Sequence, residues 1–488
     1  MRAMRAFCLF VVAALAMCTA YSQRRAAPPE PPLAPAVHDD LDRVVQQPYD
    51  ELFNSAADLK FSSKDLQVMR KHLSETETFC RSRARKSSGF YSKEEERLQK
   101  ELKRQAASID ATTRHELHCQ IQDSRSSKAQ MDLLADQLAP IAFDNGRAKL
   151  ELVEKWPAER AKVQQELNSG SYKQRRWAGV EEIGFRTIQP DQKDDIKRGE
   201  KAVKELQQQG AMPPELENKL IQDYVNTLAQ RVAENSDVQV PLKVKVLDSR
   251  EINAFALPGG FLFVQRGLLN EVEDESQLAG VLAHEMSHVA ARHSFRLYKK
   301  ALASAVAYQM AQIAALVLTG GASGIGTYYA LQYGFYGLGF ALDLNLLGVS
   351  REYELEADQL GIQYAWKSGY DPEGFIRFFD KMATKEGHVS GASWFRTHPA
   401  FYDRMVQSKR EIMFLPHKEA WIVQTHEFEQ MKQVLKEVSA KSNASQDAKR
   451  PTLLTKEENC PKPKPLYQPD EKIQAICARL SENAVAGK

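Results

Sequence analysis

The sequence lacks the features typical of a nucleic-acid-binding protein or of a protein that holds a metal through cysteine. Its formal net charge is only +2 over 488 residues, and it has no stripe of lysine and arginine with interleaved aromatic residues, so we expect no nucleic-acid partner. None of its six cysteines forms a CxxC pair. Hydrophobic residues make up 43% and charged residues 27%, as in an ordinary globular protein, and this length predicts two or three structural units.

Long apolar runs are also scarce. After the first two dozen residues, residues 301–318 come closest to a membrane span, but Tyr308, Gln309 and Gln312 interrupt them. We therefore favour a buried helix or a lid over an active site for this segment, and contact with a membrane surface stays open.

The first residues have the pattern of a secretory signal peptide. Arg2 and Arg5 precede an apolar run that ends at Met17, and small residues follow it. We expect residues 1–22 to be such a signal, which predicts an exported protein that is periplasmic or envelope-associated. An uncleaved membrane anchor is the alternative. A lipid anchor at Cys18 is not expected, because methionine directly before that cysteine fits the bacterial lipoprotein pattern poorly.

Loss of the signal leaves an even number of cysteines in an oxidising compartment, which suggests disulfide bonds. The four are Cys80, Cys119, Cys460 and Cys477. Proximity in the sequence favours Cys80–Cys119 and Cys460–Cys477 as the pairs.

Composition and periodicity divide the rest of the chain into four parts. Residues 23–40 are rich in proline and alanine and predict an extended linker. Residues 41–175 are highly charged, with few glycines and with apolar residues at helical spacing, and predict a helical region that serves as a passive spacer or as an arm for a substrate or partner. A second unit is expected over 185–415. Residues 416–488 combine an amphipathic helix with a tail that the last two cysteines would pin.

The sequence of the second unit predicts a mainly α fold with a small β-sheet, which is the α+β class. Leu242 to Val246 alternates apolar and polar residues as a half-buried strand does, and Phe261 to Val264 is a second strand candidate. A helix is expected from Glu275 to His293. Further helices are expected at 192–209, 214–234, 350–368, 372–386, 400–413 and 422–438.

The segment from His284 to His288, with the letters HEMSH, carries the clearest chemical signal. Residues four apart share a face of a helix, so both histidines can bind one metal ion. Glu285 lies about 100° round the helix from His284, where it can take a proton from water that a metal activates. Two surface histidines are the alternative, but the position inside a long periodic helix favours a metal site. His293 lies off the shared face, and we expect a structural role for it.

Catalytic zinc takes three protein ligands and leaves one position open, so a third ligand is required. The helix that begins near Ser350 offers two pairs of acidic residues at a spacing of four, Glu354 with Asp358 and Glu352 with Glu356. One member of a pair could bind zinc while the other accepts a hydrogen bond from the free nitrogen of a ligand histidine. Spacing alone leaves both pairs open, and either pair could instead be a solvated acidic face.

Together these motifs give the chain a family resemblance. It resembles the zinc metallopeptidases that include HtpX-like proteases, CAAX prenyl proteases and their soluble periplasmic relatives, which have a gluzincin-like peptidase domain. The likeness covers 185–415, near half the chain. Its motifs are Ile196 to Glu200, Asn253 to Gly260, His284 to His288, Ser350 to Asp358, and Thr397-His398-Pro399 with Arg404.

The resemblance implies roles that spacing leaves open. It implies one zinc ion per chain, with Glu354 as the third ligand and Asp358 as its hydrogen-bonding neighbour. It implies that His398 faces the metal, where it would steady the tetrahedral intermediate or occupy the open zinc position in a latent form. Arg404 would orient a nearby acidic group. The implied activity is that of a zinc metalloendopeptidase with Glu285 as the general base.

The Pro-Gly-Gly turn has an interpretation of its own. Gly259 and Gly260 let the backbone turn tightly, which would leave the following strand, with Phe261 and Phe263, as an edge that an extended peptide can join. Pairing through the backbone predicts broad specificity for unfolded or misfolded exported polypeptides, and hence a role in protein quality control. The alternative function is a latent-protease chaperone or assembly factor of the bacterial envelope, with envelope or membrane-surface partners.

Overall fold

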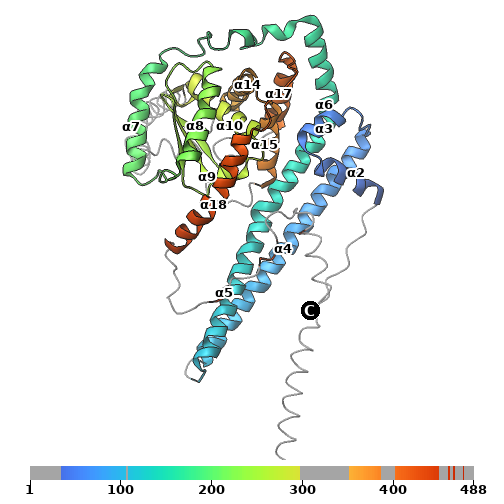
Figure 1. Cartoon of the computed structure of the whole chain (residues 1–488). Helices are drawn as coiled ribbons and strands as arrows, with labels where there is room; N and C mark the ends of the chain where they lie inside the picture. The colour runs from blue at the N-terminus through green and yellow to red at the C-terminus, as the bar shows by residue number, and fades with distance from the viewer. Residues whose placement is uncertain are drawn as a thin grey trace, which may run out of the picture. The chain divides into compact units, whose positions relative to one another are not determined.

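The structure is a computed structural model that describes residues 35–105, 108–296, 351–385 and 402–449, together with 460–461, 465–467 and 476 (Figure 1). The predicted signal peptide, residues 301–348 and His398 lie outside these residues. Two compact units divide the chain. The first comprises Met1–Gln46, Phe61–Leu150 and Pro451–Lys488, and the second comprises Gln47–Lys60 and Glu151–Arg450. The helical region predicted over 41–175 therefore contributes to both units. Among the helices that the structure describes, none is both long and apolar enough to cross a bilayer.

Long helices make up the described part of the first unit. They are α2 (Pro35–Gln46), α4 (Ser63–Gln105), α5 (Ala111–Leu133), a π-helical turn (Leu134–Leu138) and the start of α6 (Ala139–Ser169). Helices α4 and α5 lie side by side because each buries a stripe of apolar residues, and Leu98 of α4 clusters with Leu117 and Ile121 of α5 (Figure 1). Helix α2 begins at Pro35, within the predicted linker. It buries Leu41 and Val44, which lie about one helical turn apart.

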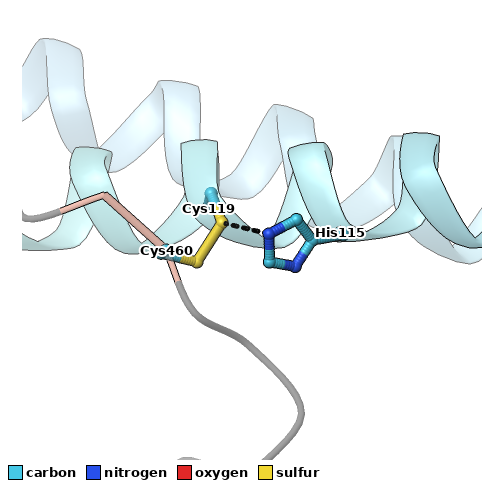
Figure 2. Close-up of a disulfide and its surroundings, with 3 residues drawn as sticks. All are labelled: His115, Cys119 and Cys460. Atoms are coloured by element: carbon cyan, nitrogen blue, oxygen red, sulfur yellow. Dashed lines mark hydrogen bonds between the residues drawn. A yellow bond between two sulfur atoms is a disulfide. The ribbon is translucent and has the colours of Figure 1, made fainter.

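One disulfide bond of the first unit joins Cys119 of α5 to Cys460 (Figure 2). The predicted pairs Cys80–Cys119 and Cys460–Cys477 are therefore wrong. Cys80 is itself disulfide-bonded and fully buried, but Cys119 is partly exposed, because it lies two residues after Leu117 and so points away from the face of α5 that packs on α4. Cys477 lies outside the described residues. Proximity in the sequence did not predict the pairing, because the face of the helix on which a cysteine lies determines which other sulfur it can reach.

The second unit mixes helices with a small sheet, which confirms the predicted α+β class. Its elements after the end of α6 are α7 (Asp195–Gln208), α8 (Lys219–Glu234), β1 (Lys243–Leu247), β2 (Ala254–Leu257), β3 (Phe261–Gln265), α9 (Arg266–Glu271), α10 (Glu275–Ala290), α14 (Arg351–Lys367), α15 (Glu373–Lys385), α17 (Tyr402–Phe414) and α18 (His426–Lys449). The short helix α3 (Tyr49–Ser55) also belongs to it, and the Trp156 indole of α6 donates to the Phe53 carbonyl.

The three-stranded sheet has the order β1-β3-β2. Strand β3 pairs with β1 in parallel and with β2 in antiparallel fashion, so that Phe263 faces Lys245 on one side and Phe255 on the other. The prediction that Phe261 and Phe263 lie on an accessible edge strand is therefore wrong, because β3 is central and all of its residues are buried. The parallel partner β1 precedes β2 in the chain, and the local sequence of β3 does not predict that it pairs with β1 as well as with β2.

The two turn glycines serve close packing rather than an open edge. A Cβ on Gly259, whose φ is 79°, would lie 2.4 Å from the Ile196 Cα, at the start of α7. A Cβ on Gly260, whose φ is 87°, would lie 2.5 Å from the Pro241 carbonyl oxygen. Only glycine combines a positive φ with such close approach.

Helix α10 runs through the core of the second unit. Every one of its residues except His288 is buried, and it contacts α14, α15, α8 and β2. A helix that is covered on all sides places polar side chains where only other protein groups or a ligand can satisfy them. His284 and Glu285 are therefore held in the interior, while the His288 side chain is partly exposed.

Candidate metal centre and active site

Helix α10 sets the positions of the two predicted histidine ligands. Asp274 caps its N-terminus by accepting a hydrogen bond from the Gln277 backbone N–H, at 2.9 Å. The residues of the HEMSH segment are helical, so His284 and His288 share one face, and their Nε2 atoms lie 3.1 Å apart. Two ring nitrogens that point at one spot from the same helix can supply two of the ligands of a metal ion.

Helix α14 supplies a carboxylate to the same spot. It approaches α10 closely at Gly361, where a Cβ would lie only 2.9 Å from the His284 backbone nitrogen. This approach brings the Glu354 carboxylate oxygens to 3.6 Å from His284 Nε2 and 3.5 Å from His288 Nε2. The three candidate ligand atoms all lie within 4.8 Å of one another. Of the two acidic pairs that spacing left open, the structure brings Glu354 to the histidines, whereas Glu352 is exposed.

A second carboxylate of α14 holds the other side of the first histidine. Asp358 Oδ1 lies 3.0 Å from His284 Nδ1, and both side chains are buried. Arg404 of α17 donates from Nε and Nη2 to the two oxygens of Asp358, each at 2.6 Å, and its Nη1 lies 3.0 Å from Glu354 Oε2. The fully buried guanidinium thus links both carboxylates and compensates their charge.

The buried charges around the candidate metal centre change the pKa values of His284 and Arg404. Burial disfavours the charged imidazole, but hydrogen bonds with Asp358 and Glu354 raise the pKa of His284 to about 9. Burial also opposes the charge on Arg404, and the same two carboxylates still raise the pKa of that guanidinium. The surroundings of His284 therefore favour positive charge, which is the electrostatic requirement for binding a cation.

Glu285 lies beside these groups without sharing the face of the histidines. It follows His284 on α10 and is buried, with 1% of its surface exposed. Its charge contributes to the raised pKa of Arg404, which places the carboxylate in the same electrostatic neighbourhood. A buried carboxylate next to a candidate metal ligand, on a different side of the helix, is suited to exchange protons with a substrate or water.

His293 and Glu356, both noted in the sequence, make contacts near this centre that spacing did not predict. His293 Nδ1 lies 2.8 Å from His288 Nδ1, and His293 Nε2 lies 3.2 Å from Glu356 Oε2. Although burial alone would raise the pKa of Glu356, hydrogen bonds from His293 and Arg296 lower it to about 2. Helical spacing could not reveal this group, because His293 comes after α10 has ended.

The donor set fits zinc. Two imidazole nitrogens and one carboxylate oxygen are a ligand combination known for catalytic zinc, which keeps a further position for water or substrate. Ligand histidines commonly present their other nitrogen to a carboxylate, as His284 does to Asp358. Among the described residues, His284, His288 and Glu354 are the group of metal-binding side chains that converges in this way.

Comparison with known families agrees with this geometry. Residues 219–411 match peptidase family M48. The chain contains a peptidase family M48 domain. This domain spans the HEMSH segment of α10, both carboxylates of α14 and Arg404 of α17, so it includes every residue of the candidate centre. Members of this family are zinc metallopeptidases, which confirms the resemblance seen in the motifs.

The matches to three curated relatives each cover less than half of the chain. The beta-barrel assembly-enhancing protease of Yersinia pestis is 30% identical over 218 residues, which are 44% of this chain and 44% of the relative. Its namesake from Escherichia coli strain K12 is 27% identical over 223 residues, 44% of this chain and 43% of the relative. The mitochondrial metalloendopeptidase OMA1 of Danio rerio is 32% identical over 204 residues, 40% of this chain and 41% of the relative. The chain thus spans less than half the length of these relatives.

Proposed function

We propose that this protein is a zinc-dependent endopeptidase, with His284, His288 and Glu354 as the ligands of one zinc ion per chain. The observation that carries the proposal is the convergence of these three side chains, from two helices, at one buried point of an M48 domain. When bound, zinc would supply a Lewis acid that polarises a peptide carbonyl and acidifies water. No rearrangement of the helices is required to bring the three ligands together.

The chain's own residues would supply the proton transfers and the orientation. The Glu285 carboxylate would accept a proton from the attacking water and return it to the leaving amine, so that the departing group leaves as a neutral amine. Asp358 would hold the proton of His284 on Nδ1 and keep Nε2 available as a ligand. Arg404 would hold Asp358 and Glu354 in position by pairing with both carboxylates in the interior.

For the substrate we propose an extended, unfolded polypeptide that pairs with β2 instead of β3. Strand β2 lies at one end of the described sheet and against α10, so a peptide aligned along it would run past the helix that carries Glu285. Backbone pairing reads shape more than side chains, which supports broad specificity for misfolded chains. His398, as the family resemblance implies, would face the metal site, where it would steady the developing charge of the reaction or close the site in a latent form.

We further propose that the protein is exported and works in the bacterial envelope. The basic and apolar start of the sequence and the Cys119–Cys460 bond both support an oxidising compartment. The relatives from Yersinia pestis and Escherichia coli carry the name beta-barrel assembly-enhancing protease, which supports envelope proteins as substrates or partners. A chaperone or assembly role is the second candidate on the same ground.

The test is cleavage of unfolded casein by the mature protein beside Glu285→Gln, with zinc content measured in both. We expect cleavage by the wild type and none by the variant at equal zinc. Glu352→Gln is the matched control, because Glu352 is an exposed carboxylate near Glu354 on α14, and it should cleave like the wild type. Cleavage by Glu285→Gln would refute the role of Glu285. Zinc binding without any cleavage would favour the assembly factor, and His398→Ala would then be examined for released activity.

A further inference from the structure

The two candidate histidine ligands present their second ring nitrogen to different kinds of side chain. His284 presents Nδ1 to Asp358 at 3.0 Å, whereas His288 presents Nδ1 to another imidazole, His293 Nδ1, at 2.8 Å. The far nitrogen of His293 then meets a carboxylate, Glu356 Oε2, at 3.2 Å. The three side chains form a line from the candidate metal centre to Glu356, here called the imidazole chain.

We propose that His293 is a positioning residue that fixes the tautomer and orientation of the zinc ligand His288, with Glu356 as its anchor. The inference rests on the proposed function, since it assigns His288 Nε2 to the metal. A neutral imidazole that offers Nε2 as a ligand carries its proton on Nδ1. That proton can be donated only if His293 Nδ1 bears a lone pair, so the proton of His293 is on Nε2 and is donated to Glu356. One arrangement of protons satisfies the whole chain.

The anchor at the end of this chain is held from several directions. Arg296 donates to Glu356 Oε2 at 2.7 Å, while the Trp177 indole donates to Oε1 and the Arg176 guanidinium pairs with it, both at 3.1 Å. A carboxylate surrounded by cationic and N–H donors stays ionised and acts only as an acceptor. It therefore determines which way the hydrogen bonds of His293 point.

The backbone is shaped to bring His293 back to His288. On a continued helix, residues five apart point in directions about 140° apart, so the contact requires the helix to end between them. It ends because Arg292 adopts a positive φ of 54°, a conformation that is unfavourable for a side chain of this kind. Asp195 holds Arg292 there through hydrogen bonds of 2.6 and 2.9 Å, and Pro190 accepts another from it.

A second residue other than glycine with a positive φ lies at the other end of the imidazole chain. Trp177, which donates to Glu356, has a φ of 61°, and its carbonyl accepts hydrogen bonds from Arg186 and Gln363. Backbone conformations of this type cost about 1–3 kcal/mol each and persist where the surroundings enforce them, often at functional sites. The positive φ of Arg292 therefore helps to place His293, and the positive φ of Trp177 helps to place the indole that donates to Glu356.

The ring of His293 is also fixed by packing, which offers the competing explanation. It stacks on Tyr353, with ring centroids 4.7 Å apart and planes 9° apart, and it is 3% exposed. If this packing were its whole role, an aromatic ring without nitrogen would replace it well. If the acceptor at Nδ1 is what matters, an amide oxygen would replace it better.

Two substitutions separate these roles. In His293→Asn the amide oxygen can occupy the position of Nδ1 and accept from His288, whereas His293→Phe keeps a ring for Tyr353 and offers no acceptor. We expect the zinc affinity, measured by competition with a chromogenic chelator, to fall about 10- to 100-fold in His293→Phe, the usual effect of losing such a partner. The affinity of His293→Asn should lie between that variant and the wild type. Equal affinity in His293→Phe and the wild type, or a weaker affinity in His293→Asn than in His293→Phe, would overturn the proposal.

A control removes a buried polar contact on the same helix without touching the imidazole chain. Tyr364 of α14 donates to Asp237 at 2.9 Å and is fully buried, so Tyr364→Phe should lower the stability of the metal-free protein and leave the zinc affinity unchanged. A loss of affinity in this control equal to that in His293→Phe would show general destabilisation and refute the assignment. Failure of the wild type to bind zinc would instead overturn the proposed function, whereas normal zinc binding and cleavage in His293→Phe would overturn this inference alone.

Discussion

Arg404 and Asp358 form a bidentate ion pair inside the second unit, with Nε–Oδ2 and Nη2–Oδ1 distances of 2.6 Å and almost no exposure of either side chain. The same guanidinium lies 3.0 Å from Glu354 Oε2, so one cation from α17 pairs with both carboxylates of α14 that face the candidate metal centre. Packing of α17 against α14 and the charge of the centre are therefore coupled.

Removal of this cation should destabilise the protein strongly. Arg404→Met leaves two carboxylates buried without their partner, and we expect a loss of about 3–5 kcal/mol in the free energy of unfolding, measured with urea on the metal-free protein. Lys219→Met is the control, because the Lys219–Asp223 pair is exposed and should contribute at most about 1 kcal/mol. A similar effect of both substitutions would show that Arg404 does not compensate buried charge.

Loss of the carboxylate behind His284 should weaken zinc binding. Asp358→Asn keeps an oxygen near His284 Nδ1 but loses the negative charge and the bidentate contact with Arg404. We expect a decrease in zinc affinity of about 10- to 100-fold in chelator competition. Glu352→Gln on the exposed side of α14 should change nothing. An affinity of Asp358→Asn equal to that of the wild type would contradict the role given to this residue.

Zinc should stabilise the folded second unit through its ligands. At free zinc a thousandfold above the dissociation constant, binding adds about 4 kcal/mol to the free energy of unfolding, so a chelator should lower the midpoint of thermal unfolding. Glu354→Gln removes one ligand and should unfold at nearly the same temperature with and without the chelator. An equal shift in both proteins would place zinc at a different site.

The contact between α10 and α14 should tolerate no added side chain at Gly361. A Cβ there would lie 2.9 Å from the His284 backbone nitrogen and 3.0 Å from its Cα, so Gly361→Ala must push the helices apart. We expect a loss of about 1–3 kcal/mol in stability and weaker zinc binding. Gly89→Ala is the matched control within an exposed stretch of α4, where nothing lies within 4 Å, and it should stabilise its helix by about 0.5–1 kcal/mol. Equal changes in both variants would contradict the close packing.

Peptide mapping should show the disulfide of the first unit directly. In non-reduced digests of protein produced in an oxidising compartment, we expect the peptide that contains Cys119 to be linked to the peptide that contains Cys460. Cys119→Ser should abolish that linked peptide. A Cys80–Cys119 link would support the pairing inferred from sequence proximity and contradict the structure.

The sequence by itself predicted most of the helices of the second unit and the pair of histidines at the candidate metal centre. Periodicity places α10 and α14 correctly to within a few residues, because helix formation depends on residues three and four apart. The same spacing puts His284 and His288 on one face. These are local properties, and they can be seen without knowing where any distant segment lies.

Only the tertiary structure decided which distant segments meet. The choice of Glu354 over Glu352 depends on the close approach of α14 to α10 at Gly361. The central position of β3 depends on a parallel strand from earlier in the chain, and the contact of His293 with His288 depends on the positive φ of Arg292. Such contacts are set by packing and backbone geometry across long separations, which spacing along one helix or strand does not encode.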